Sequence, residues 1–582
     1  MCGIVGKINF NNEKIKKEEI RKMLKVLRHR GPDGNNVYIN NNVGIGHVLL
    51  KIQDLTDDSL QPYEYENYVL AFNGEIYNYI KLKEDLIKKG YKFKTCGDTE
   101  VLIKYIHCYG LDKALREIEG CYAIVLYDKE NKITHIIRDR FGIKPLYYYK
   151  DENKIVFASE IKSILEDKNI KKQVDFETMA ISFNCRLWMD PKKTLFRNIY
   201  MLEPGHYLRI NNTIVEDIQY YKLDFSEKYE DSRELIKDFS IEFMDSINKK
   251  LISKVPIAAF LSGGIDSSVV CKLLNDNTSE PLNTYTICYN KDKDLDLNHA
   301  KELGLKEGFK QHNILISEDM YNIENIDKVT YGVEEVLIDK VYIPMYFNYK
   351  AAKDDGFTVV VSGQGADEVW LGYIFTWRLF EFLGNKANID TLLKQYYLKN
   401  MLFYNKLNDD FKKILIPTLK NYLNKNLQLN SKDVLNSYSD LSIKTILHDL
   451  LMQEDKIAMA HSVESRVPFV DNHKIVELAY KAPSGLKIKD GREKYIIRKF
   501  SEGKLPDSII KREKYPFPEP PSIYNEKIRE LCIANWQDIL KSKILSKVID
   551  FNNIREVDDF SATEQWMLLA YWRFEKVFDV EV

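Results

Sequence analysis

The second half of the chain alternates between short segments that predict strands and stretches with helical periodicity. Strands are predicted at residues 255–261, 283–289, 310–316 and 357–361, and the first of these is an apolar run that predicts a buried strand. Apolar residues recur every four positions from Leu235 to Ile247, which predicts an amphipathic helix. Strands that alternate with helices indicate a parallel sheet covered on both faces, with ligands bound at the carboxyl ends of its strands.

Two of these predicted strands end in glycine-rich turns. The first runs into Ser262-Gly-Gly264 and the fourth into Ser362-Gly-Gln-Gly365. Glycines let the backbone approach a ligand closely, and N–H groups at the start of a helix bind phosphate oxygens. No lysine follows the first turn as in a P-loop, so a bound pyrophosphate leaving group suits it better than γ-phosphate transfer. The alternative is an ordinary Ser/Gly turn between a strand and a helix.

Each turn is followed by an acidic residue, Asp266 and Asp367. Carboxylate oxygens are ligands that Mg²⁺ prefers, and parallel strands bring their following loops to one edge of the sheet. We therefore predict that these two carboxylates hold Mg²⁺. The competing interpretation of Asp367 is an acid that stabilises a helix N-terminus.

The length of 582 residues indicates two or three domains. The net charge of −2 gives no reason to expect nucleic acid or an anionic membrane as a partner. No apolar run has the length of a membrane span, and the first 20 residues lack a signal-peptide core. The eight cysteines include no C-x-x-C pair, which fits a reducing compartment, so we predict a cytoplasmic protein.

The chain opens with Met1-Cys2-Gly-Ile-Val-Gly6. Removal of Met1 would leave Cys2 with a free α-amino group that titrates near neutrality and takes the proton of its own thiol. A nucleophile and its base would then come from one residue. An incidental cysteine near the start of the chain is the alternative.

Five further segments follow in order: His29–Asp33, Asn73–Asn78, Gly97–Glu100, Arg138–Tyr147 and Phe157–Lys162. With the opening residues they resemble the class II glutamine amidotransferase domain. The resemblance implies an α+β N-terminal-nucleophile fold over residues 1–210, with two stacked antiparallel sheets between helical layers.

The same resemblance implies roles for individual residues. Cys2 would attack the side-chain amide of glutamine, and the Asn73 side chain with the Gly74 N–H would form the oxyanion hole. Asp98 would hold the α-ammonium group. Glu75 and Ile52 would also contact glutamine. The Asn73-Gly74 pair is also typical of a hairpin turn.

One position departs from the amidotransferase pattern. The family has an arginine that binds the glutamine carboxylate where this chain has Leu49. Leucine cannot replace a bidentate guanidinium. Lys51, two residues further on, would share a strand face with Leu49, and we predict that it makes a weaker carboxylate contact. The alternatives are a preference for free ammonia or another amide donor.

Four later segments are Asp455–Ala460, Val463–Asp471, Arg492–Lys494 and Leu505–Ile509. With the glycine-rich turns they resemble the synthetase domain of glutamine-hydrolysing asparagine synthetases, which implies an α/β ATP-pyrophosphatase domain over residues 233–582. The resemblance implies ATP and Mg²⁺ as cofactors and a catalytic Lys494 at the α-phosphate. The implied ATP-binding residues are Leu261, Ser262, Gly263, Gly264, Asp266, Ser267, Ser268, Ser362 and Gly363.

The acceptor site also departs from the family pattern. Gln364 stands where the family has a glutamate, and Leu337–Ile343 lacks the usual hydroxyl-bearing residues, with Lys340 in place of an arginine. We predict that Gln364 and Lys340 contact the acceptor acid. The resemblance implies glutamine or ammonia, ATP and a small carboxylic acid, L-aspartate by default, as substrates, and a homodimer is the default assembly.

Three functions remain open at this point. The first is conversion of L-aspartate to L-asparagine through an acyl-adenylate. The second is an amide-forming relative that acts on another acid in a specialised pathway; ring-closing relatives typically lose the N-terminal cysteine, so Cys2 argues against those. The third is a catalytically silent protein that keeps the fold to bind a nucleotide or a partner.

Overall fold

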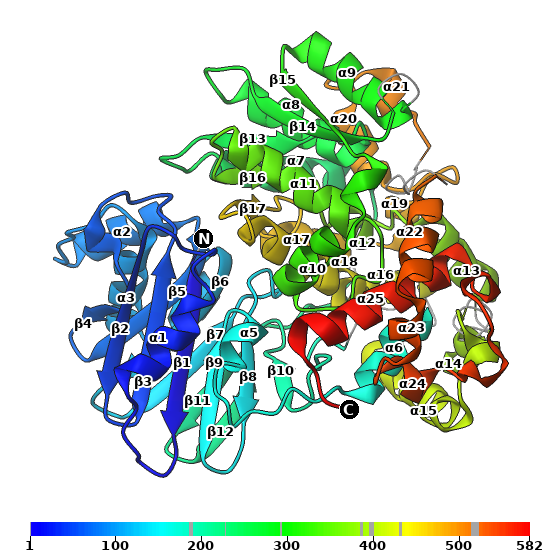
Figure 1. Ribbon diagram of the computed structural model, residues 1–582. Helices are drawn as coiled ribbons and strands as arrows, with labels where there is room; N and C mark the ends of the chain where they lie inside the picture. The colour runs from blue at the N-terminus through cyan, green and yellow to red at the C-terminus, as the bar shows by residue number, and fades with distance from the viewer. Residues whose placement is uncertain are drawn as a thin grey trace.

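The computed structural model describes the chain except Met1 and residues 186–189, 227, 291–293, 385–387, 395–400, 430–432 and 514–522. Two antiparallel sheets come first along the chain and a parallel sheet follows (Figure 1). This arrangement confirms the fold class predicted for each half.

The first half contains two six-stranded antiparallel sheets. One has the order β10-β8-β9-β1-β3-β2, with strands Gly3–Asn9 (β1), Gly34–Asn40 (β2), Val43–Leu49 (β3), Tyr147–Lys150 (β8), Lys154–Ala158 (β9) and Ile199–Met201 (β10). The other has the order β12-β11-β7-β6-β5-β4, with strands Tyr63–Tyr65 (β4), Tyr68–Ile76 (β5), Gly120–Asp128 (β6), Ile133–Arg138 (β7), His206–Asn211 (β11) and Ile214–Gln219 (β12).

These two sheets pack face to face between helices. Ile45 of β3 and Val125 of β6 belong to one apolar cluster between the sheets. Helix α1 (Lys17–Lys25) packs on the outer face of the first sheet, while α2 (Tyr79–Lys88), α3 (Asp98–Tyr109) and α4 (Leu111–Glu117) cover the second. Because both of its faces are covered, β6 is buried along its whole length.

The Asn73-Gly74 pair does not form the predicted hairpin turn. Both residues lie inside β5, where they pair with Ala123 and Tyr122 of β6. Gly74 has a φ of +153°, and a Cβ there would lie 2.1 Å from the carbonyl oxygen of Cys121. The glycine is therefore required by close approach of two strands, and the hairpin interpretation was wrong.

The second half is built on a parallel sheet of order β15-β14-β13-β16-β17. Its strands are Ile257–Phe260 (β13), Asn283–Cys288 (β14), Lys310–Leu315 (β15), Val359–Val361 (β16) and Glu464–Arg466 (β17). The first four confirm the predicted strands, and β17 was not predicted. The strand order reverses at β13, so the loops after β13 and β16 leave the sheet side by side.

Helices connect these strands and surround the sheet. They include α7 (Ser232–Lys250), α8 (Ile265–Asp276), α9 (Leu295–Glu307), α10 (Ile323–Val333), α11 (Tyr342–Asp354), α12 (Ala366–Val369) and α17 (His448–Met459). The predicted amphipathic helix is confirmed as α7, whose apolar stripe from Leu235 to Ile247 is fully buried.

Further helices fill the C-terminal third: α13 (Ile374–Leu383), α14 (Ile389–Leu392), α15 (Asp409–Asn426), α16 (Val434–Ser442), α18 (His473–Tyr480), α19 (Ser484–Lys487), α20 (Tyr495–Ser501), α21 (Asp507–Ile510), α22 (Ile523–Ala534), α23 (Trp536–Leu540), α24 (Leu545–Val548) and α25 (Ala562–Phe578). Across the described residues, no helix combines the length and apolarity needed to cross a membrane.

The two halves are joined by long-range contacts. Helix α6 (Phe176–Cys185) packs against α15, and the hydroxyls of Ser182 and Tyr571 are 2.8 Å apart. The N-terminus lies where the antiparallel sheets approach β17 and α17 (Figure 1). The start of the chain is therefore close to both halves.

Candidate active sites

Cys2 lies directly before β1 and is buried, with 7% of its surface exposed. Its N–H donates to Oδ1 of Asn73 at 3.0 Å. Burial raises the pKa of the Cys2 thiol to about 11, so the thiol is protonated at neutral pH and needs a base before it can act as a nucleophile. A free α-amino group on Cys2 is the base that the sequence predicts.

Asn73 has the geometry expected of an oxyanion donor. Its side chain is fully buried, and its Oδ1 is used by Cys2. Its Nδ2 has no hydrogen-bond partner among the described residues. A buried amide donor without an acceptor is costly, and a developing oxyanion beside Cys2 would satisfy it.

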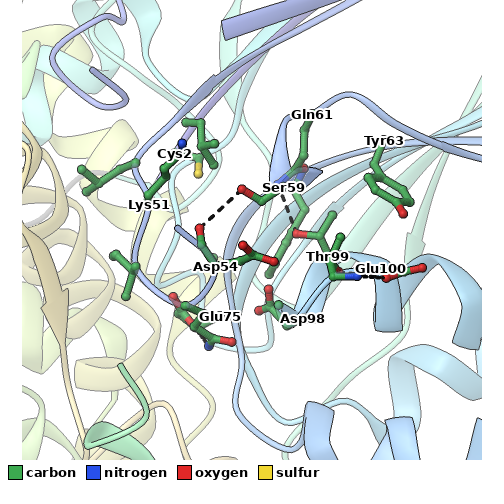
Figure 2. Close-up of a pocket in the computed structure, with 18 of the residues that line it drawn as sticks. Cys2, Lys51, Asp54, Ser59, Gln61, Tyr63, Glu75, Asp98, Thr99 and Glu100 are labelled. Carbon is green, nitrogen blue, oxygen red and sulfur yellow. Dashed lines mark hydrogen bonds between the residues drawn. The ribbon is translucent and has the colours of Figure 1, made fainter. Parts of the chain in front are cut away.

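A pocket opens beside Cys2 and is lined by the strand β5, the segment after β3 and the start of α3. Figure 2 shows the carboxylates of Asp54, Glu75 and Asp98 across this pocket from Cys2. Ile52, Gly74 and Leu49 also line it. The structure thus brings the predicted glutamine-binding residues together around one cavity.

Asp98 begins α3, and its Oδ2 accepts a hydrogen bond from the N–H of Ile76 at 2.8 Å. Burial raises the pKa of Asp98 to about 7. Glu75 accepts from the side chain of Gln53, and burial together with the charge of Glu464 raises its pKa well above the usual value. An arriving ammonium group would favour the ionised form of these acids.

Lys51 does not share a strand face with Leu49. Strand β3 ends at Leu49, and Lys51 lies in the irregular segment beyond it. Both residues nevertheless line the pocket, and Lys51 is its only basic residue in the part of the chain that the structure describes. The Lys51 Nζ lies 2.7 Å from Oδ1 of Asp57, whose side chain is 84% exposed. This ion pair is screened by solvent and weakly held.

The sequence did not predict a role for Arg30, which lies between α1 and β2. Its guanidinium is fully buried, and Nε donates to the carbonyl oxygen of Cys2 at 3.0 Å. Its other nitrogens donate to Glu160 and to Asp455 of α17, each at 2.8 Å. All three partners lie in segments that carried the family resemblance, but no pattern indicated that they meet.

The second site forms at the reversal of the parallel sheet. The loop Leu261–Ser268 follows β13, and the loop Ser362–Glu368 follows β16. Gly263 has a φ of +70°, and a Cβ on Gly363 would lie 2.8 Å from the N–H nitrogen of Ser267. The two loops are therefore packed directly together, as the positions of their strands predict.

Lys494 bridges these loops. Its Nζ lies 2.5 Å from Oδ2 of Asp266 and 2.6 Å from Oδ1 of Asp367. A Cβ on Gly372 would lie 1.9 Å from the Asp367 carboxylate, so this glycine makes room for the pair. The two acids raise the pKa of Lys494 above its usual value against the opposing effect of burial, so the lysine stays charged.

The two carboxylates suit a divalent cation. Oδ1 of Asp266 is buried without a hydrogen-bond partner among the described residues, and the ammonium of Lys494 stands where a cation would be held. Next to them, Glu368 is buried, and burial together with the charge of Asp367 raises its pKa to about 7. The donor set therefore fits Mg²⁺.

The two residues predicted to contact the acceptor differ in their surroundings. Gln364 lies in the loop after β16, where its N–H donates to Oγ of Ser362 at 3.4 Å. Lys340 donates from Nζ to Oδ1 of Asn525 on α22 at 2.5 Å. Its neighbour Leu337 is fully buried and accepts at its carbonyl oxygen from Nε1 of Trp566 at 2.6 Å.

Comparison with protein families agrees with this arrangement of two sites. A family model described as a glutamine amidotransferase domain matches residues 1–221. A second, described as asparagine synthase, matches residues 239–552. Each match contains one of the two sites.

Individual relatives extend over nearly the whole chain. Asparagine synthetase [glutamine-hydrolyzing] 1 of Bacillus subtilis is 33% identical, and the match covers 89% of this chain and 87% of that protein. Asparagine synthetase [glutamine-hydrolyzing] 3 of the same organism is 29% identical over 98% of this chain and 95% of that protein. Amidase chry2 of Gibberella zeae is 26% identical over 90% of this chain and 89% of that protein.

Proposed function

Since the chain belongs to the family of glutamine-hydrolysing asparagine synthetases, we propose that it converts L-aspartate to L-asparagine with nitrogen taken from glutamine. The family membership makes it an amidotransferase that uses glutamine, ATP and a carboxylic acid. Residues 1–210 would form the glutaminase domain and residues 233–582 the synthetase domain. One observation carries the proposal: the chain that places a buried thiol against Asn73 also gathers two carboxylates and a lysine at the sheet reversal.

In the first half-reaction, the α-amine of Cys2 takes the thiol proton and the sulfur attacks the side-chain amide of glutamine. Asn73 and the N–H of Gly74 stabilise the tetrahedral oxyanion. The α-ammonium group of Cys2 then gives this proton to the amide nitrogen, which leaves as ammonia, and water hydrolyses the thioester to release glutamate. Asp54, Glu75 and Asp98 form an acidic wall of the pocket. On this wall Asp98 holds the α-ammonium group of glutamine, while Lys51 contacts the α-carboxylate.

In the second half-reaction, the aspartate side-chain carboxylate attacks the α-phosphorus of ATP, and pyrophosphate leaves. The loop Leu261–Ser268 holds the β- and γ-phosphates with its N–H groups and hydroxyls, and Lys494 neutralises charge at the α-phosphate. Asp266 and Asp367 would hold Mg²⁺, which when bound neutralises charge on the phosphates. Ammonia then displaces AMP from the acyl-adenylate, and the product is an amide.

Product analysis tests this proposal directly. The chain is incubated with ATP, Mg²⁺, L-aspartate and glutamine labelled with ¹⁵N in its amide. Mass spectrometry should detect ¹⁵N-asparagine, glutamate, AMP and pyrophosphate in equal amounts. ADP and orthophosphate as the nucleotide products would exclude the acyl-adenylate.

A second candidate is amide formation on a different carboxylic acid. Two observations favour it: Gln364 stands where the family pattern has a glutamate, and the segment Leu337–Ile343 lacks the usual hydroxyl-bearing residues, with the Leu337 carbonyl bound by Trp566. A relative of similar extent is named an amidase, not an asparagine synthetase. A panel of carboxylic acids, scored by acid-dependent pyrophosphate release, separates the two. Aspartate should give the highest kcat/KM if the first proposal holds.

A further inference from the structure

Arg30 joins the nucleophile of the first half to a helix of the second. Its guanidinium, which is inaccessible to solvent, donates to three acceptors at 2.8–3.0 Å. One acceptor is the main-chain oxygen of Cys2, one is Glu160 of the same half, and the third is Asp455, on α17.

The charges around Arg30 show why Asp455 matters. Glu160 is shared, because His29 Nε2 lies 3.0 Å and Lys162 Nζ 2.6 Å from its oxygens. The Asp455 carboxylate forms an ion pair with the guanidinium of Arg30 at 2.8 Å, and the Nζ of Lys144 lies further from it, at 3.5 Å. Without Asp455, Glu160 would be the one carboxylate left within ion-pair distance of Arg30 among the described residues, and Glu160 is already shared with Lys162. A buried guanidinium with too few acceptors moves to find others, because a buried unpaired charge is costly.

Helix α17 is itself fixed to the nucleotide-binding sheet. Glu454, the residue before Asp455, accepts hydrogen bonds from Tyr349 of α11 at 2.8 Å and from Ser465 of β17 at 2.7 Å. Burial raises the pKa of Glu454, and a hydrogen bond from the hydroxyl of Ser362, which begins the second glycine-rich loop, acts in the opposite direction by stabilising the carboxylate. The position of Asp455 is therefore set by the sheet that carries the ATP site.

We propose that Asp455 is a positioning residue for the glutaminase reaction: the synthetase half holds Arg30, and Arg30 holds Cys2. The main chain of Cys2 is then fixed on both sides, at its nitrogen by Asn73 and at its oxygen by Arg30. This inference rests on the proposed glutamine hydrolysis at Cys2. It makes the glutaminase site complete only when the two halves are packed together.

The test separates the two half-reactions in the full-length chain. Asp455→Ala, Asp455→Asn and Asp455→Glu are compared with the wild type. Glutamate release gives kcat and KM for glutamine, and a glutamine-like diazoketone measures the rate of Cys2 alkylation. Pyrophosphate release with ammonium measures the synthetase site alone. Tyr571→Phe is the matched control, because it removes a buried hydrogen bond between the halves without touching Arg30.

Asp455→Ala should lower kcat for glutamine hydrolysis and the alkylation rate by about 10²-fold, because a displacement of about 1 Å at a reacting group has that effect. KM for glutamine and ammonium-dependent pyrophosphate release should stay within about threefold, a difference of less than 1 kcal/mol. Asp455→Glu should recover more of the activity than Asp455→Asn, because it restores the charge.

Three results would overturn the inference. Wild-type rates of hydrolysis and alkylation in Asp455→Ala would show that Arg30 needs no partner in α17. An equal loss in Tyr571→Phe, or a parallel loss of ammonium-dependent pyrophosphate release, would show a general loss of packing. Absence of glutamate release by the wild type would instead contradict the proposed function.

Discussion

The two candidate sites, the pocket beside Cys2 and the loops around Lys494, differ in their charge. The first gathers acids beside a neutral thiol, with Lys51 as the only basic lining residue in the described chain. The second places one lysine between two carboxylates, so one of the two negative charges is compensated before any ligand arrives. The first site is therefore suited to a substrate with an ammonium group, and the second to a polyanion that arrives with its own cation.

The two sites also differ in the elements that position their residues. Asn73 and Gly74 lie inside a buried strand, whereas the residues proposed to bind phosphate lie in loops at the ends of strands. In both sites the groups proposed to act at the reacting atoms match the family pattern. The departures, Leu49 in one and Gln364 in the other, are at positions where the family pattern predicts contacts with the remainder of the substrate. We therefore expect different residues to determine the chemistry and the choice of substrate.

The largest effect is expected from removal of the nucleophile of the first site. Cys2→Ala should lower glutamine-dependent amide formation by at least about 10³-fold, because Cys2 is the only thiol among the described residues that line the pocket. Amide formation with ammonium should remain. Both rates are measured as labelled product by mass spectrometry. Glutamine-dependent product from Cys2→Ala would contradict the assignment of the thiol.

Removal of divalent cations should impair the ATP-dependent half-reaction and leave glutamine hydrolysis intact. Chelation, or Asp367→Asn, should lower AMP release by at least about 10²-fold, since the charge on the departing pyrophosphate is then poorly neutralised. Glutamate release by the same preparation should not change. Restoring Mg²⁺ in excess should recover the chelated wild type but not Asp367→Asn. Equal loss of both half-reactions would contradict separate sites.

Much of this architecture is predictable from the sequence, for a physical reason. Strands β13 and β16 are short apolar runs inside the sheet, so hydrophobicity alone marks them. Strand β15 has the sequence Lys-Gln-His-Asn-Ile-Leu, has no buried residue and lies at the edge of the sheet, so it follows instead from the alternation of strands and helices along the chain. Strand β17 has the sequence Glu464-Ser-Arg466 and carries charge into the core. Arg466 donates hydrogen bonds to Glu464 and to main-chain oxygens at the end of α7 and just after it. These main-chain partners are distant in the sequence, so they leave no local pattern that would predict the strand.

The candidate sites divide in the same way. Cys2, Asn73, Asp266 and Lys494 stand in motifs, so their roles are carried by resemblance. The link from Cys2 through Arg30 to Asp455 spans 425 residues between its last two members. This link can be recognised only from the packing of the two halves in the folded structure. The prediction of a hairpin at Asn73-Gly74 was wrong because the dipeptide Asn-Gly, which is typical of turns, here lies in a strand that needs a glycine for close approach to its neighbour.

A smaller effect is expected from substitution of Lys51, the residue proposed to contact the carboxylate of glutamine. Lys51→Ala should raise KM for glutamine about tenfold and leave kcat nearly unchanged, as expected for a charge-assisted hydrogen bond. Lys129→Ala is the control, because it removes a similar surface ion pair with Glu64 away from the pocket. Asp57→Asn should leave KM unchanged or lower it, since it releases Lys51. An unchanged KM in Lys51→Ala would exclude this contact.

The smallest effect tests whether the acidic wall binds the ammonium group. Asp98 has a pKa raised to about 7 by burial, so it is mostly neutral at pH 6 and mostly ionised at pH 8. Only the ionised form attracts an ammonium group, so KM for glutamine should be higher at pH 6 than at pH 8, by up to about tenfold for one group titrating near 7. The α-amine of Cys2 titrates in the same range, but it acts on the chemical step. Asp98→Asn separates the two, because its KM should be high and nearly independent of pH, while its kcat should keep the wild-type pH profile. A KM that still falls with rising pH in Asp98→Asn would assign the titration to another acid of the pocket, with Glu75 next in line.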